Sequence, residues 1–429
     1  MLNSILFHIK KLIPQVVFRG LQPAYHWCMA LAAAIFYRFP SRQIKIVAVT
    51  GTKGKTSVTE MTNAILEQAG FKTALCNTIR FKVGDSSRDN LYKMSMPGRF
   101  FIQKFLRQAV KAGCDYVVME ATSQGALMQR HKFIQFDALI FTNIAPEHIE
   151  AHGSFENYVN AKVSIARAVA ASKKSRRIIV ANADDAQAQK FLNGGFKRDF
   201  TDKLPYSLDD AKPFNLFKEG FAMTVQGVLI KSQLSGEFNI YNELAAITFA
   251  LSQNIPIETC RLAIEKHSVI RGRVERIEAG QDFAVVVDYA HTPDSLQQFY
   301  RVFKGSRRIC ILGNTGGGRD TWKRDEMARI AESECDEIIL TNEDPYDDDP
   351  QAIVDDMARA LTIKTPHVIM DRREAIAAAI NMARTGDSVL ITGKGTDPFI
   401  MGPNNTKIPW SDAAVAREEL EKLANRATI

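Results

Sequence analysis

A glycine-rich turn directly after the first apolar run carries residue types that bind phosphate. The run Ile46–Thr50 leads into seven small, hydroxylated or basic residues, which are Gly51, Thr52, Lys53, Gly54, Lys55, Thr56 and Ser57. A helical pattern follows from Val58. Backbone N–H groups at such a strand–turn–helix junction favour anions. The pattern predicts a nucleotide site in which Lys55 reaches the β- and γ-phosphates and Thr56 holds Mg²⁺.

A carboxylate stands at the end of another apolar run, Tyr116–Glu120. If both runs are neighbouring strands of one parallel sheet, Glu120 lies beside the glycine-rich turn. Carboxylate oxygens are the ligands that Mg²⁺ prefers in proteins. Glu120 is therefore a candidate metal ligand, with a purely structural carboxylate as the alternative.

Short apolar runs alternate with amphipathic stretches from Ile44 onward, which predicts parallel α/β sheets. The candidate strands of the first half are Ile44–Val49, Tyr116–Glu120, Ala138–Thr142 and Ile178–Ala181, with short alternating strands around 214–235. Those of the second half are Ala284–Asp288, Arg308–Leu312, Glu337–Thr341, His367–Met370 and Ser388–Thr392. We expect a central ATP-binding domain at 45–270 and a Rossmann-like C-terminal domain at 271–429, with a hinge at 271–273.

Composition indicates an ordinary globular protein: 46% of the 429 residues are apolar, 24% are charged, and the net charge is +7. This mild excess suits anionic ligands or solubility, and no concentrated basic stripe points to nucleic acid. The six cysteines include no C-x-x-C pair. They are predicted to be reduced cytosolic thiols, forming neither a disulfide framework nor a zinc site.

The segment 1–44 is apolar and basic. Apolar residues between Leu2 and Ile13 share one helical face, Pro14 and Pro23 interrupt the segment, and Ala24–Tyr37 is too short for a comfortable membrane span. One interpretation is a pair of helices packed on the body of the protein. The other is peripheral contact with the inner membrane surface. The expected location is the cytoplasm, with or without that contact.

Several motifs together resemble the Mur ligase family of peptidoglycan synthesis, and within it the MurE type, from about residue 45 to 424. The motifs are Gly51–Ser57, Glu120–Gln124, Thr142–His148, Asn160–Lys162, Asn182–Asp185, Ser235–Asn242, Asp288–Leu296 and Gly313–Arg324. The family also includes folylpolyglutamate synthetase. Lys53, Thr122, Gln124 and Glu147 depart from the residues usual there.

The resemblance implies an ATP-dependent amide-bond ligase that activates a carboxylate as an acyl phosphate. Its implied catalytic residues are Lys55, Glu120, His148 and Lys162, and its implied metal ligands are Thr56, Glu120, His148 and Lys162, for two Mg²⁺ ions. In relatives the lysine matching Lys162 is carbamylated. Beyond the glycine-rich turn, the implied nucleotide contacts are Asn143, Asn239, Asn242, Arg273, Asp288 and His291.

The implied substrates are an amino acid and a muramyl-peptide-like acceptor. Ser95, Thr122 and Arg130 match acceptor contacts, and the residues expected near the amino acid are Arg319, Glu343, Asp344, Pro345, Tyr346, Gly393 and Asp397. MurE enzymes that add meso-diaminopimelate carry an arginine where this chain has Tyr346. An acidic site favours a side-chain ammonium, hence lysine or ornithine, unless the acidic run is a solvated loop.

MurE proteins usually begin with a UDP-binding domain of about a hundred residues, for which the first 44 residues are too short. The leading expectation is a monomer that adds an amino acid to UDP-N-acetylmuramoyl-L-alanyl-D-glutamate. One alternative is a MurT-like or folylpolyglutamate-type ligase with a non-UDP acceptor, although the cysteine pairs of the MurT zinc ribbon are missing. Another is a weakly active, membrane-associated nucleotide-binding scaffold. A dinucleotide loop at Gly313–Asp320 is disfavoured by its glycine spacing.

Overall fold

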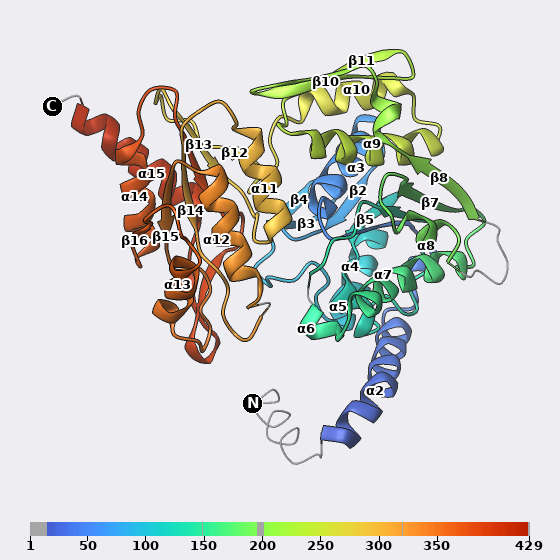
Figure 1. Cartoon of the computed structure of the whole chain (residues 1–429). Coiled ribbons are helices and arrows are strands. Elements are labelled where there is room, and N and C mark those ends of the chain that lie inside the picture. The colour runs from blue at the N-terminus through green and yellow to red at the C-terminus, as the bar shows by residue number, and fades with distance from the viewer. Residues whose placement is uncertain (1–14, 148, 195–200, 320, 428–429) are drawn as a thin grey trace.

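The computed structural model describes residues 15–147, 149–194, 201–319 and 321–427, and two large sheets organise it (Figure 1). The first sheet has eight strands in the order β4-β3-β2-β5-β1-β6-β7-β8. Their bounds are β1 (Lys45–Thr50), β2 (Thr73–Cys76), β3 (Arg80–Val83), β4 (Ser86–Asp89), β5 (Tyr116–Glu120), β6 (Ala138–Phe141), β7 (Arg177–Asn182) and β8 (Thr201–Tyr206). Because β1 pairs in parallel with β5 and β6, the carboxyl ends of these three strands share one edge.

Both faces of this sheet are covered, which explains why its central strands are continuously apolar. Val47 and Val49 of β1 face α3 (Lys55–Gln68), α9 (Glu237–Ser252) and α10 (Ile257–Lys266). Ile46 and Ala48 face α4 (Arg99–Lys111) and α7 (Phe155–Ala170). A three-stranded antiparallel sheet of β9 (Phe214–Phe217), β10 (Gly220–Val225) and β11 (Val228–Ser232) confirms the short strands expected there.

The second sheet has six strands in the order β12-β13-β17-β14-β15-β16. Their bounds are β12 (Glu275–Arg276), β13 (Ala284–Val287), β14 (Arg308–Leu312), β15 (Glu337–Leu340), β16 (His367–Val368) and β17 (Ser388–Ile391). All pairings except that of β12 are parallel. One face is covered by α11 (Pro293–Val302), α12 (Lys323–Glu334) and α13 (Pro350–Arg359), the other by α14 (Arg372–Met382) and α15 (Asp412–Ala427). The α/β class and the Rossmann-like second half are confirmed.

A single helix, α2 (Gln15–Phe36), precedes the first sheet and packs on α4. Pro23 lies inside it, so the prediction that this proline interrupts the segment is wrong. One internal proline removes a single N–H donor, a penalty that packing of the helix elsewhere outweighs. The predicted amphipathic pattern between Leu2 and Ile13 lies outside the described residues. No helix in the described part of the chain is long and apolar enough to cross a membrane.

The prediction that all six cysteines are reduced is also wrong, because Cys310 and Cys335 form a disulfide. Cys310 lies on β14 and Cys335 ends α12, and both are buried between the sheet and its helices. Residues 25 apart in the sequence come to a Cα–Cα distance of 6.0 Å only because the β14–α12–β15 crossover returns the chain beside its starting strand. The other four cysteines are free thiols.

Candidate active site

The glycine-rich turn joins β1 to α3 at the carboxyl edge of the first sheet. Gly51 and Gly54 have φ of 154° and 78°, values that residues with a side chain rarely adopt. A Cβ on Gly51 would collide with Thr142 Oγ1, and one on Gly54 with Asn242 Oδ1. The turn can therefore lie this close to β6 and α9 only without side chains at these positions. Its backbone N–H groups at the start of α3 form the expected anion site.

Two lysines converge on one carbonyl of this turn. Lys55 Nζ donates to the carbonyl oxygens of Gly51 and Thr52 at 2.9 and 2.7 Å. Lys162 Nζ, from α7, donates to the Gly51 carbonyl at 2.7 Å and lies 4.7 Å from the centre of the Tyr158 ring. Burial, reinforced by the positive charge of Lys55, holds the pKa of Lys162 well below its ordinary value. Burial thus disfavours the charged form of the Lys162 amine.

Glu120 is the centre of a polar cluster beside the turn. Its Oε1 accepts hydrogen bonds from Thr56 Oγ1 at 2.7 Å and from the Thr78 N–H at 2.9 Å. Its Oε2 accepts from Thr78 Oγ1 at 2.9 Å, and that hydroxyl lies 2.7 Å from Ser95 Oγ. The carboxylate is fully buried at the end of β5, in register with Val49 of β1. The sheet register therefore brings together Glu120 and Thr56, two oxygen donors of the kind that Mg²⁺ takes.

The loop after β6 is hydrogen-bonded to the glycine-rich turn. Asn143 Oδ1 accepts from the Lys53 N–H at 3.0 Å, and Thr142 Oγ1 donates to the Lys53 carbonyl at 2.6 Å. Asn143 thus holds the turn itself. Further along the loop, Glu147 Oε1 lies 3.1 Å from His291 Nε2 of the second half. His148, predicted as a catalytic residue and metal ligand, lies outside the described residues.

The two asparagines predicted to approach the nucleotide lie on α9, behind the glycine-rich turn. Asn242 Nδ2 donates to Asn239 Oδ1 at 2.9 Å, and Asn239 Nδ2 donates to the Ser235 carbonyl at 2.9 Å. Both side chains are buried. These two hydrogen bonds hold the Asn242 side-chain amide against Gly54.

The second half contributes cationic and acidic groups to the same place. Arg273 Nη2 donates to Thr56 Oγ1 at 3.3 Å, and its guanidinium lies 4.6 Å from the centre of the Tyr289 ring. Asp288 accepts the Val274 and Ala290 N–H groups at 2.8 and 2.7 Å and fixes the backbone around Arg273. Burial raises the pKa of Asp288, while Arg273 opposes that shift. The predicted residues Arg273, Asp288 and His291 therefore lie near the glycine-rich turn. Arg273 contacts Thr56 at the start of α3, whereas Asp288 and His291 contact other parts of the protein.

The predicted acceptor residues lie next to the Glu120 cluster. Thr122 caps α5 (Ser123–Leu127) by accepting the Gly125 N–H at 3.0 Å. Arg130 donates to the Met96 carbonyl and reaches Met128 Sδ at 3.0 Å. Burial lowers the pKa of Arg130, and the nearby Arg99 adds to the effect. Because Met96 follows Ser95, Arg130 supports the loop that brings Ser95 to Thr78.

The predicted amino-acid residues form a charged network that is already paired. Asp344 Oδ2 lies 2.7 Å from Lys93 Nζ, and its Oδ1 lies 2.7 Å from Lys394 Nζ. Asp397 lies 2.9 Å from the same Lys93 and 3.6 Å from Lys394. Although burial opposes ionisation of Asp344, Lys394 and Lys93 hold its pKa below the ordinary value. Two aspartates meet two lysines, so this part of the acidic run is electrically balanced and is no solvated loop.

The remaining predicted residues of that region surround the network. Glu343 is buried and accepts from Thr315 Oγ1 at 2.9 Å, with its other carboxylate oxygen against Gly393. Pro345 leads into Tyr346, which has a φ of 53° and lies with its ring centre 4.8 Å from the exposed Arg319 guanidinium. Arg319 therefore stacks on Tyr346, at the exposed side of this group of residues.

Family models match two stretches of the chain: the Mur ligase middle domain at residues 49–250, and the glutamate ligase domain of Mur ligases at residues 272–395. A UDP-N-acetylmuramyl-tripeptide synthetase of Roseiflexus sp. (strain RS-1) is 37% identical over 92% of this chain and 82% of its own length. The chain belongs to the Mur ligase family. A 2,6-diaminopimelate-adding ligase of Syntrophomonas wolfei is 36% identical to this Mur ligase over 91% of the chain and 81% of its own length.

Solved structures agree with this assignment. A UDP-N-acetylmuramoyl-L-alanyl-D-glutamate–2,6-diaminopimelate ligase superposes with a TM-score of 0.60 and 26% identity, covering 89% of this chain and 79% of that one. The folylpolyglutamate synthase of Mycobacterium tuberculosis shares the fold, with a TM-score of 0.69 and 15% identity over 86% and 93% of the two chains. As a Mur ligase, the protein is an ATP-dependent acid–amino-acid ligase.

Three residues of the site were missed from the sequence of this Mur ligase. Thr78 binds Glu120 through its N–H and its hydroxyl, Tyr158 OH lies 2.9 Å from Thr52 Oγ1, and Lys93 joins the amino-acid region. Each is a lone polar residue in a loop or on a helix, with no spacing that separates it from other threonines, tyrosines or lysines. Only the fold brings them to the site.

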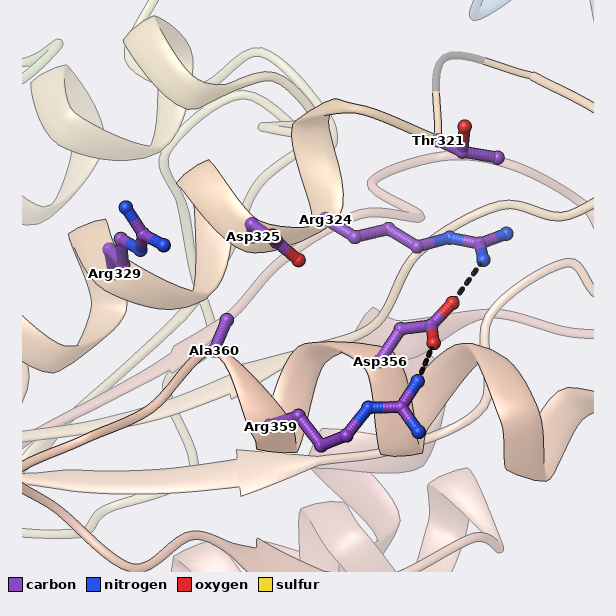
Figure 2. Close-up of a pocket in the computed structure, with 7 residues that line it drawn as sticks. All are labelled: Thr321, Arg324, Asp325, Arg329, Asp356, Arg359 and Ala360. Carbon is purple, nitrogen blue, oxygen red and sulfur yellow. Dashed lines mark hydrogen bonds and ion pairs between the residues drawn. The ribbon is translucent and has the colours of Figure 1, made fainter.

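A surface hollow of about 360 Å³ between α12 and α13 is separate from the glycine-rich turn (Figure 2). Its lining includes three arginines, but Asp356 pairs with both Arg324, at 2.8 Å, and Arg359. Arg329 points away from the other two in Figure 2. The arginines therefore do not converge on one point as an anion site requires.

Proposed function

We propose that this ligase adds an amino acid to UDP-N-acetylmuramoyl-L-alanyl-D-glutamate in the cytoplasmic stage of peptidoglycan precursor synthesis. The observation that carries the proposal is the position of Lys162, buried 2.7 Å from the Gly51 carbonyl beside the Thr56–Glu120 pair. The names of the relatives support the acceptor, since they act on this or a closely related muramyl peptide. We further propose an ATP-binding domain at 45–270, a C-terminal domain at 271–429, a monomer, and membrane contact through 1–44.

ATP is proposed to bind with its phosphates over the glycine-rich turn. Lys55 and Arg273 supply positive charge there, and the N–H groups at the start of α3 supply further donors. These groups bind the β- and γ-phosphates and stabilise the charge that moves onto the leaving ADP. Asn143 and Asn242 keep the turn in the shape that this contact needs.

Thr56 and Glu120 fit Mg²⁺, because both offer oxygen atoms from a buried site. Protonated Lys162 does not fit, since a cation at this position would repel the metal. As a neutral amine it can add CO₂ and lose a proton, which gives a carbamate whose single negative charge is shared by two oxygens. We infer that Lys162 holds or orients Mg²⁺ in that form. Bound Mg²⁺ would screen the repulsion between ATP and the acceptor carboxylate.

The chemical sequence has two steps. A carboxylate oxygen of the acceptor attacks the γ-phosphorus, the bond to the β–γ bridging oxygen breaks, and an acyl phosphate and ADP result. The amine of the incoming amino acid then attacks the acyl carbon, and inorganic phosphate and a proton leave. The cluster of Ser95, Thr78 and Glu120 positions the acceptor carboxylate next to the turn. Contact of both halves around the turn excludes water from the acyl phosphate.

The side chain of the incoming amino acid binds at Asp344 and Asp397, and these two carboxylates select it. Lys93 and Lys394 already balance these two carboxylates. The argument from acidity for lysine or ornithine is therefore weaker than the sequence alone suggests, and lysine, ornithine and meso-diaminopimelate stay open as substrates. An ammonium substrate has to displace Lys93, whereas a substrate with a distal carboxylate can use it.

Phosphate release from ATP and Mg²⁺ tests the proposal, with UDP-N-acetylmuramoyl-L-alanyl-D-glutamate and each of these three amino acids. Release that requires both the acceptor and one amino acid supports it and identifies the amino acid. A protein that binds ATP but releases no phosphate with any pairing refutes this acceptor. Folate and lipid-linked glutamyl acceptors would then be the next candidates, as for a folylpolyglutamate-type or MurT-like enzyme. A protein that turns over none of them would be a nucleotide-binding scaffold.

A further inference from the structure

In the helix α2 the buried residues are alanines, and several large apolar residues are exposed. Ala30, Ala33 and Ala34 are buried, whereas Tyr25, Trp27, Ile35 and Phe36 are 55%, 44%, 57% and 71% exposed. An amphipathic helix on a water-soluble surface shows the opposite arrangement. Figure 1 shows α2 leaving the first half at one edge of the molecule. A cluster of large apolar side chains at an edge indicates a surface that meets something other than water.

The charge around this helix has one sign. No aspartate or glutamate occurs in the sequence before Glu60, and α4, on which α2 packs, contains arginine and lysine but no acidic residue. Arg38 and Arg42, just beyond α2, and Lys104 on α4 are exposed. The apolar side chains are thus accompanied by positive charge that no acidic residue of these two helices cancels.

The two helices are joined firmly enough to present one surface. Arg107 of α4 donates to the Tyr37 carbonyl through Nε and Nη2 at 3.0 and 2.8 Å, and to the Arg38 carbonyl at 3.0 Å. Phe100 of α4 lies with its ring centre 6.3 Å from that of Phe36. The exposed rings of Phe36 and Phe100 therefore belong to one face, whereas the Trp27 ring packs on Phe133, with their ring centres 5.2 Å apart.

We propose that this α2–α4 face, formed by Tyr25, Ile35, Phe36 and Phe100 with Arg38, Arg42 and Lys104, docks on an anionic lipid bilayer. Apolar side chains enter the interface while lysine and arginine meet the anionic headgroups. Tyr25 suits this interface because tyrosine has an apolar body and a polar group. The inference deepens the location given under the proposed function and does not depend on the ligase chemistry.

Sedimentation of the full-length protein with vesicles tests this docking. Vesicles of phosphatidylcholine mixed with phosphatidylglycerol should bind the protein, and vesicles of phosphatidylcholine alone should bind it at least about tenfold more weakly. The double variant Ile35→Ser/Phe36→Ser should lower the partition coefficient at least about tenfold, because it removes two inserted apolar side chains. The double variant Leu229→Ser/Ile363→Ser changes exposed apolar residues elsewhere and should bind as the wild type does.

The charged part of the face is tested by Arg38→Gln/Lys104→Gln, with Lys266→Gln/Lys304→Gln as the matched control. The first pair should lose most of the preference for anionic vesicles, and the second pair should keep it. Equal binding to both kinds of vesicle, or binding that the α2–α4 variants leave unchanged, would overturn the proposal. So would a concentration-dependent dimer in light scattering that Ile35→Ser/Phe36→Ser converts to monomer, since a second copy would then cover the face.

Phosphate release without lipid separates this proposal from the ligase function. The α2–α4 variants alter no residue of the candidate active site and should turn over at the wild-type rate in solution. Retained turnover with lost vesicle binding supports the docking face and also shows that the variants are folded. Wild-type protein that turns over but binds no vesicle overturns the docking face and leaves the ligase function standing.

Discussion

At the scale of single residues, the surroundings of Lys162 matter most for the proposed chemistry, because they disfavour a positive charge on its amine. It is buried, it shares the Gly51 carbonyl with Lys55, and its pKa is held well below the ordinary value. Folding therefore shifts the proton equilibrium of Lys162 towards the neutral amine, which is the form that reacts with CO₂. A helix lysine in the sequence becomes a candidate metal-site residue through burial.

Replacing Lys162 with Met should abolish turnover while stabilising the metal-free protein near neutral pH. We expect a loss of at least about 10³-fold in kcat, since the metal site loses a ligand or its orientation. The pKa of Lys162 is lower in the folded state than in the unfolded chain. Between these two pKa values the unfolded chain binds the proton more strongly, so the stability of the wild type rises with pH across that range. The gain of Lys162→Met in thermal melting should thus shrink from pH 7 towards pH 10. Unchanged phosphate release in this variant would show that the metal-site assignment is wrong.

Carbamylation has its own spectroscopic signature. A ¹³C NMR spectrum of wild-type protein with ¹³C-bicarbonate should show a carbamate carbonyl signal that Lys162→Met lacks. Partial rescue of Lys162→Ala by formate or acetate would point to the same missing carboxylate-like group. A signal that persists in Lys162→Met would assign the carbamate to another amine.

Lys93→Met is expected to change amino-acid selection. It removes one of the two cations that balance Asp344 and Asp397. The uncompensated carboxylate should then attract a side-chain ammonium, raising kcat/KM for lysine relative to meso-diaminopimelate by about tenfold. Arg271→Ala is the control, because its ion pair with Asp89 is exposed and lies outside this network. An unchanged ratio of kcat/KM for lysine to kcat/KM for meso-diaminopimelate would show that Lys93 takes no part in selecting the amino acid.

Among the structural elements, α9 combines a site role with an unusual buried acid. Its amides Asn239 and Asn242 support the glycine-rich turn, and Glu243, the next residue, is fully buried with Ser232 Oγ 2.5 Å from its Oε1. Burial raises the pKa of Glu243 to about 8, although the hydrogen bond from Ser232 opposes the shift. The helix therefore carries a carboxyl group that is neutral at pH 7.

Glu243→Gln should stabilise the protein in a pH-dependent way. The folded pKa lies above the unfolded one, so the wild type loses stability as pH rises from about 4.5 to about 8, by about 1.4 kcal/mol per pH unit. The variant does not titrate and should be favoured increasingly over that range. Urea unfolding at about pH 5, pH 7 and pH 8 measures the difference. A constant difference between variant and wild type would mean that Glu243 does not titrate abnormally.

The β14–α12–β15 crossover predicts a definite number of reactive thiols. With Cys310 and Cys335 joined, the four free cysteines are Cys28, Cys76, Cys114 and Cys260. Alkylation in denaturant without reductant, followed by mass spectrometry, should modify these four, and reduction should add the other two. Six modified residues without reductant would show that the bridge is absent under those conditions.

At the scale of the whole molecule, charged contacts join the two halves around the site. Lys53 pairs with Asp294, Glu147 with His291, and Lys93 with Asp344 and Asp397. Arg273 reaches Thr56 from the opposite half. These contacts lie among the residues of the candidate active site, so we expect substrate binding and contact between the halves to be coupled.

High salt should therefore weaken the contact between the halves, chiefly at the pair of Lys53 with the half-exposed Asp294. The Debye length falls from roughly 10 Å at 0.1 M to about 3 Å at 1 M salt, which weakens exposed pairs most. Small-angle scattering at these two concentrations should show a larger radius of gyration at the higher one. Lys93→Met/Asp294→Asn should be expanded already at the lower concentration. A radius that neither salt nor these substitutions change would mean that apolar packing holds the halves together.

The sequence by itself determined the elements and the chemistry that depends on local order. The apolar runs placed Tyr116–Glu120 and Arg308–Leu312 with the bounds that the structure has, and the residues after the first run predicted the glycine-rich turn between β1 and α3, because strand periodicity and turn geometry are local properties. Tertiary structure decided what depends on burial and on contacts distant in sequence. It paired Cys310 with Cys335, carried α2 through Pro23, balanced Asp344 with Lys93, and buried Lys162 so that its pKa is lowered. These outcomes depend on which residues the fold brings together and buries, and the spacing of residues along the sequence does not give that information.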